Sequence, residues 1–225
     1  MAKELSVDEL WDSAPNGERA FRPPQVAGLP EAARRYLEHA IAPGTPLASA
    51  VRLRMHGEII LQVRMHGEIK LQRWYPFRAE QVIHWDRGMI WKATLRMHGM
   101  PIRWSDRLVD GEGATQEKLF GIIPIMTASG PDITRSATGR VAAESVWLPS
   151  ALCGDEVSWT APDLSHAHRS FMMQGAPVKL ELAIDDAGRL QTVKLSRWGN
   201  PEGAVFHYVD FGGVVEKEAT FGGYT

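Results

Sequence analysis

Histidine is the residue type in this chain that is best spaced for chemistry. The tetrapeptide RMHG occurs three times and supplies His56, His66 and His98, and the first two are followed two residues later by Glu58 and Glu68. On paired strands each His shares a face with its Glu, and directly opposed Cβ atoms lie ~4.5–5.5 Å apart. Such a set could bind Zn²⁺ or act as an acid–base pair in a small hydrolase. A solvated polar strand face is the simpler interpretation.

A second group of metal-ligating residues lies in the segment DLSHAH. His166 and His168 are two residues apart, so on a strand they point to the same side and could chelate one metal ion. Asp163 or His207 would supply the third ligand. Because H-x-H pairs are frequent by chance, this zinc site competes with the interpretation that the histidines are ordinary surface residues. Zinc is the one cofactor that the sequence suggests.

Aromatic and methionine side chains form a third group, which points to binding rather than catalysis. Eight tryptophans and nine methionines are many for 225 residues. We expect several of them to line a pocket for a small apolar ligand, with charged residues at the rim to hold a polar head group. The expected lining is Trp74, Trp85, Trp91, Met97, Trp104, Phe171 and Met173, and the expected rim is Arg103, Asp106 and Arg107. An ordinary core explains the same residues, so both interpretations stay open.

Composition and missing motifs narrow the choice of function. The sequence has no G-x-S-x-G, P-loop, H-E-x-x-H or C-x-x-C motif, which removes most support for common hydrolase, nucleotide and zincin classes. A formal net charge of −2 argues against a nucleic-acid partner. Cys153 is the single cysteine, so no intramolecular disulfide can form. The N-terminus MAKELSVDEL has no apolar signal segment, and no stretch approaches ~20 apolar residues, so we expect a cytoplasmic protein without a membrane span.

Strands with period-two alternation must position most of these residues. Between 51 and 71 every odd position is apolar or Gly, whereas the even positions, Ile60 excepted, are polar or charged. Residue patterns predict further strands over 77–85, 88–97, 100–109, 155–160, 166–174, 177–184, 189–197, 204–211 and 214–220. A helix is predicted within residues 29–44, and two helical pieces within about 114–152.

The predicted fold class is α+β, mainly antiparallel β. Residues 1–28 form an N-terminal segment, and residues 29–225 form one domain built on a strongly curved half-barrel sheet. The N-terminal helix packs on this sheet, and the helical insertion over about 114–152 covers it as a lid.

A tandem duplication lies inside the first strand region. LRMHGEIILQ (53–62) and VRMHGEIKLQ (63–72) match at eight of ten positions. Because ten is even, every residue of the second copy keeps the face of its counterpart. One strand over both copies would be far longer than the usual 3–10 residues. We therefore expect one copy to occupy the strand, and the other to form an extension, a hairpin or a contact in a homodimer.

Three motifs, WYPFRAEQVIHWDRGMIWKAT, DDAGRL and FHYVDFGGVVEKEATFGGYT, resemble those of a bacterial family known only as a domain of unknown function. The predicted architecture over roughly residues 29–225 is similar to the lipoprotein-carrier (LolA/LppX-like) half-barrel, where an incomplete antiparallel barrel and a helical lid enclose an apolar cavity. This resemblance implies a lipid-like ligand between sheet and lid, and it carries over no catalytic residues. Those carriers have an export signal, which is not seen here. A binding module is thus favoured, and the small hydrolase remains the alternative.

Overall fold

The computed structural model describes the chain except for residues 1–3, 16, 18, 66–68, 155–157 and 202–204, and within 61–72 it describes the backbone only. The helices are α1 (Val7–Asp12), α2 (Glu31–Ala40) and α3 (Pro131–Glu144), with short 3-10 turns at Pro23–Val26, Ser145–Trp147 and Pro149–Cys153. The strands are β1 (Ala50–Met65), β2 (Ile69–His84), β3 (Gly88–Met97), β4 (Met100–Val109), β5 (Glu112–Leu119), β6 (Ile123–Ser129), β7 (Ser158–Thr160), β8 (His166–Met173), β9 (Ala176–Ile184), β10 (Leu190–Gly199) and β11 (His207–Val214). None of the described helices is long and apolar enough to cross a bilayer.

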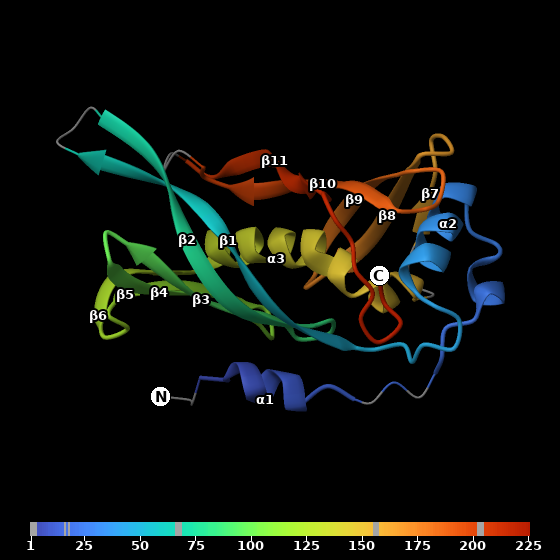
Figure 1. Ribbon diagram of the computed structural model, residues 1–225, viewed down its shortest axis with the longest axis horizontal. Coiled ribbons are helices and arrows are strands. Elements are labelled where there is room, and N and C mark those ends of the chain that lie inside the picture. Colours follow the sequence, from blue (N-terminus) through green and yellow to red (C-terminus); the bar gives the residue numbers. More distant parts are fainter. Residues whose placement is uncertain (1–3, 16, 18, 66–68, 155–157, 202–204) are drawn as a thin grey trace.

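The strands form two antiparallel sheets, which confirms the mainly antiparallel β class. The first has the order β1-β2-β3-β4-β5-β6 and the second the order β11-β10-β9-β8-β7 (Figure 1). In the described ladders the outermost strand of each sheet pairs on one side only, so neither sheet closes into a barrel. The expectation of one continuous sheet is wrong. Helix α3 follows β6 and packs against strands of both sheets. It thus separates the antiparallel strands of the first sheet from those of the second along the chain.

The segment that precedes α3 differs from its predicted helical state. Residues 112–129 form β5 and β6, and only the later part of the expected insertion is helical. Phe120 and Gly121 have φ values of 53° and 76°, which closes the strands into a hairpin. Pro124 lies on the edge strand β6, where a missing N–H is tolerated. A short apolar run does not distinguish strand from helix, and that ambiguity caused the error.

Glycine-containing turns connect strands of the first sheet. His98 and Gly99, between β3 and β4, both have positive φ (50° and 81°), as a type I′ hairpin turn requires. Gly88, at the start of β3, has φ 115°, and a Cβ there would lie 2.1 Å from the Leu108 carbonyl oxygen. At the other end of the chain, β11 ends at Val214, so the strand expected over 214–220 is not formed.

The main hydrophobic core joins α2, α3 and the second sheet. Leu37, Val141 and Leu180 are fully buried in it. A smaller cluster lies on the inner face of the first sheet, the face that contacts α3, and it contains Trp91, Leu95, Ile102 and neighbouring residues. Buried residues of α2 and α3 thus pack with apolar strand residues in one core.

Helix α1 covers one end of the opposite, outer face of the first sheet. Ser6 and Glu9 form a reciprocal capping box at its start. Leu10 then packs against Val82 and Ile90, which explains why these two outer-face side chains are buried. The helix is only six residues long, so the other end of the outer face stays uncovered.

The duplicated segment lies in the paired strands β1 and β2, and a hairpin is one of the three arrangements expected for it. The first copy lies within β1, and the second runs over the end of β1 and the start of β2, with residues 66–68 outside the described part. Ladder pairing extends to Met65 opposite Ile69, but β2 pairs with β3 only over Phe77–His84. Residues 58–65 and 69–76 therefore extend beyond β3 as a two-stranded ribbon (Figure 1). The homodimer contact stays a prediction.

Candidate functional site

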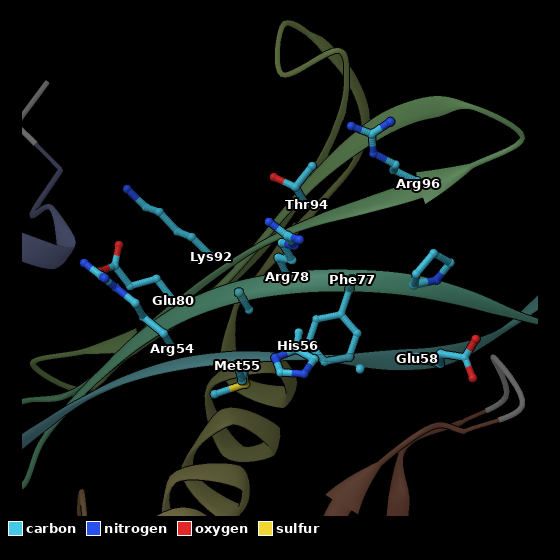
Figure 2. Close-up of a pocket in the computed structure, with 13 residues that line it drawn as sticks. Arg54, Met55, His56, Glu58, Phe77, Arg78, Glu80, Lys92, Thr94 and Arg96 are labelled. Carbon is cyan, nitrogen blue, oxygen red and sulfur yellow. The ribbon is translucent and has the colours of Figure 1, made fainter. Parts of the chain in front are cut away.

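An open groove runs over the uncovered end of the outer face. One hollow of about 1160 Å³ is lined by residues of β1, β2 and β3 (Figure 2). A second, of about 630 Å³, lies over β3 to β6 beside the N-terminal segment. Lys92 and Thr94 line both hollows, so the two adjoin each other. We call this combined surface the outer groove.

The register of the strands places cationic side chains from neighbouring strands next to each other along this groove. Directly opposed residues of neighbouring strands share a face. One row runs from Arg54 through Glu80 and Lys92, and the next from His56 through Arg78 and Thr94 to Arg103 and Lys118. Arg96 follows Thr94 two residues later on β3, so it points to the same side. Figure 2 shows Arg54, Arg78, Lys92 and Arg96 on β1, β2 and β3.

The charges of the outer groove are mostly uncompensated. Within the described residues, no salt bridge is formed by any of six cations: Arg54, Arg78, Lys92, Arg96, Arg103 and Lys118. Glu80 pairs instead with Arg52 at 2.7 Å. The chain as a whole carries a formal charge of −2, so this positive surface is a local feature. Such a surface attracts anions.

An apolar strip continues the groove onto the two-stranded ribbon. Pro76 lines the larger hollow and faces Glu58 across the β1–β2 ladder. Two residues further along, on the same face, Ile60 is paired with Trp74. These two side chains are 41% and 59% exposed, so both present apolar surface to solvent. The outer face therefore combines a cationic area with an adjoining apolar area.

The predicted His/Glu site is only partly described. His56 and Glu58 lie on the outer face of β1 and line the groove. His98 lies in the β3–β4 turn, where its Nε2 is 3.4 Å from the hydroxyl of the buried, inner-face Tyr75. His56 and His98 thus point to opposite faces of the sheet, and β2 lies between their strands β1 and β3. His66 and Glu68 lie outside the described residues, and the hydrolase alternative stays a prediction.

The predicted zinc ligands are only partly brought together, since Asp163 contacts His166 but His207 lies elsewhere in the sheet. His166 Nδ1 lies 2.9 Å from Asp163, whose carboxylate also accepts the backbone N–H of Ser165. The His166 contact is the main cause that lowers the Asp163 pKa. His168 is on the same strand, but His207 is on β11, three strands away. Over the described part of the chain, no three His, Cys, Asp or Glu side chains are grouped to hold a metal ion.

The residues predicted to line an apolar pocket lie in three places. Trp91, Trp104 and Met97 belong to the inner-face cluster, where the two indole rings meet edge-on at 5.9 Å. Trp85, Phe171 and Met173 belong to the main core. Trp74 and Arg103 lie on the outer face. The expected rim is split too, since Arg107 lines the outer groove whereas Asp106 contacts α3.

A polar cluster between α3 and the inner face was missed by sequence reasoning. Arg140 of α3 donates to Asp106 at 2.6 Å and to Glu144 at 2.8 Å, and Gln81 donates to Glu144 at 2.6 Å. Nearby, burial first and the Asp106 charge second raise the pKa of Glu117. The sequence did contain a signal for this cluster, because Gln81, Asp106 and Glu117 occupy strand positions that the alternating pattern assigns to the apolar face. These hydrogen bonds tie the helix to the sheet.

A second buried polar group lies in the main core. Arg169 is 0% exposed and donates to the Ala151 carbonyl at 2.8 Å, with its guanidinium 4.3 Å from the Phe171 ring centre. Burial lowers the Arg169 pKa to about 9 and raises the Cys153 pKa to about 11. Packing thus keeps the single thiol protonated, which makes it a poor nucleophile.

Comparison with known proteins identifies the family. No curated protein and no solved structure matches the chain, so the similarity to lipoprotein carriers stays a prediction. A family model described as "Family of unknown function (DUF6544)" matches residues 19–225, which include both sheets, all the cations of the outer groove and the polar cluster under α3. This match confirms the family predicted from the sequence motifs: the chain belongs to DUF6544.

Proposed function

We propose that the protein is a binding module for a lipid-like molecule with an acidic head group, held in the outer groove. The observation that carries this proposal is the set of six cations without a described salt-bridge partner on one face. Anions form charge-assisted hydrogen bonds with Arg and Lys, which are about twice as strong as neutral ones. The head group lies by Arg78, Lys92 and Arg96.

The apolar part of the ligand follows the ribbon. Pro76, Trp74 and Ile60 continue the same face from the cations towards the hairpin end. An alkyl chain on this strip removes exposed indole and aliphatic surface from water, which is favourable by about 25 cal/mol per Å². An amphipathic molecule thus matches the order of charged and apolar areas along the groove.

Access favours the outer face over the predicted space beneath the helix. On the inner side, Trp91, Leu95 and Ile102 are only 5%, 1% and 4% exposed. A ligand there would have to displace packed core side chains, which protein interiors resist. On the outer side, Arg78, Lys92 and Trp74 are all exposed. We therefore keep the lipid-like ligand expected from the sequence, but place it on the outer face of the first sheet instead of beneath the helix.

Calorimetric titration with laurate and its uncharged methyl ester tests the proposal. Replacing both Arg78→Gln and Lys92→Gln removes two head-group contacts, so laurate affinity falls roughly 10- to 100-fold while ester affinity is unchanged. Trp74→Ser weakens both ligands, roughly tenfold. Lys179→Gln, an exposed lysine on the second sheet, is the matched control and binds as the unmodified protein.

Two results would overturn the proposal. One is equal affinity for laurate and its ester, which would show that the cations do not recognise the head group. The other is unchanged laurate binding in the double variant, provided that its circular dichroism and melting temperature match those of the control.

A further inference from the structure

The β5–β6 hairpin carries a concentrated set of exposed apolar side chains. Phe120, Ile122, Ile123 and Ile125 are 51%, 76%, 52% and 53% exposed. Four such residues within six positions are more than the scattered single apolar residues of ordinary surfaces. We call these four residues the apolar tip. It lies at the end of the first sheet where the β3–β4 hairpin also turns (Figure 1).

The backbone conformation at this turn is unfavourable for Phe120. Phe120 has φ 53°, a conformation that bulky side chains rarely adopt and that Asn, Asp or Gly would adopt more easily. The ring is half exposed, so burial within the chain offsets little of this strain. The turn is nevertheless fixed, because the Phe120 N–H donates to the Pro101 carbonyl at 2.9 Å. A hydrogen-bonded turn thus presents an aromatic ring to solvent.

Cations border the apolar tip. Gly121 carries no side chain, and a Cβ there would lie 2.8 Å from Arg103 Nε, so the guanidinium packs directly on the turn. Lys118 precedes the tip by two residues and, like Arg103, forms no described salt bridge. On the neighbouring hairpin, Met100 is 39% exposed, close in sequence to Arg96. Exposed apolar groups flanked by cations are typical of surfaces that enter an anionic bilayer interface.

We propose that the apolar tip docks the protein on the surface of an anionic lipid bilayer. Phe120, Ile122 and Ile125 enter the interface, and the flanking Arg103 and Lys118 contact the lipid head groups. A second copy of the chain fits less well, because tip-to-tip contact would bring the cations of both copies together. This docking stands on the exposure, strain and charge of the β5–β6 hairpin and does not depend on a ligand in the outer groove.

Vesicle co-sedimentation at low salt tests the docking. The unmodified protein is expected to sediment with vesicles containing about one third phosphatidylglycerol, more weakly with pure phosphatidylcholine, and less as salt rises. The double variant Ile122→Ser with Ile125→Ser loses binding, by roughly tenfold for each isoleucine. The control is Leu164→Ser, since Leu164 is 64% exposed in the loop before β8, outside the first sheet.

Several results would overturn the docking. These are absence of sedimentation with either vesicle, binding by the tip variant equal to that of the control, or self-association that the tip variant abolishes without any vesicle binding. Laurate titration of the tip variant separates the two proposals. Retained laurate affinity with lost vesicle binding shows that docking depends on the apolar tip and not on the groove ligand. If the unmodified protein does not bind laurate, only the groove proposal is refuted.

Discussion

Replacement of Asp106 by Ala tests the role of the polar cluster under α3. One carboxylate oxygen accepts hydrogen bonds from the Trp104 indole at 2.9 Å and the Thr115 hydroxyl at 2.6 Å, and the other accepts from Arg140 at 2.6 Å. The Asp106 and Arg140 side chains are 23% and 15% exposed. Hydrogen bonds to a fully buried charged group contribute about 1.5–3 kcal/mol, and the partial exposure of Asp106 reduces this to about 1 kcal/mol for each neutral donor. Leaving a largely buried Arg with one partner fewer adds about 1–3 kcal/mol. We therefore expect Asp106→Ala to lower the free energy of unfolding by about 3–5 kcal/mol.

Urea unfolding followed by circular dichroism measures this loss. The matched control is Asp210→Ala, because Asp210 pairs with Lys194 but both side chains are more than half exposed. Surface pairs of this kind contribute little, so the control should unfold at nearly the same urea concentration as the unmodified protein. Equal destabilisation of the two variants would refute the reasoning, since the loss would then follow charge removal rather than the buried hydrogen bonds.

Three further predictions concern the backbone, pH and the thiol. Gly88→Ala should destabilise the fold by about 2 kcal/mol more than Gly99→Ala in thermal unfolding, since both have positive φ but only a Cβ at position 88 meets a carbonyl; equal losses would contradict this. Burial raises the folded-state pKa of Glu117, so the contribution of this carboxyl to stability is present at low pH and is lost as pH rises. Glu117→Gln should therefore raise the free energy of unfolding near pH 7 but not below the unfolded-state pKa. A gain in stability that is independent of pH would refute this. With its pKa near 11, Cys153 should react with iodoacetamide at pH 8 roughly a hundredfold more slowly than free cysteine, and an equal rate would show that the thiol is not buried.

The strands could largely be predicted from the sequence because alternation is a local signal. In β8, Ala167, Arg169, Phe171 and Met173 are buried, and the residues between them are exposed or half-buried. The same alternation would have placed Arg169 in the core had it been applied to polar residues. The basic residues of the outer groove likewise occupy even positions in the sequences of β1 and β3, so their common face could be predicted within each strand. Which residues lie opposite each other on neighbouring strands depends on the strand register, which the sequence of a single strand does not encode.

Identical short segments adopt different structures here, which limits prediction from motifs. RMHG at 54–57 lies inside β1, where β2 pairs with every residue. RMHG at 96–99 ends β3, and its His98 and Gly99 form the turn. The difference comes from the partner strands, since Met97 and Met100 are the last pair of the β3–β4 ladder. The candidate site was hard to predict for the same reason: its cations come from five strands that only the fold brings together.

Indole NMR signals test the place of the ligand most directly. In a titration with laurate followed by ¹H–¹⁵N correlation spectra, the outer groove predicts that the indole signal of the exposed Trp74 shifts, together with backbone amides around Arg78, Lys92 and Arg96. The signals of Trp91 and Trp104, on the inner face, should stay in place. Shifts confined to Trp91, Trp104 and α3 would contradict the outer groove and place the ligand between sheet and helix.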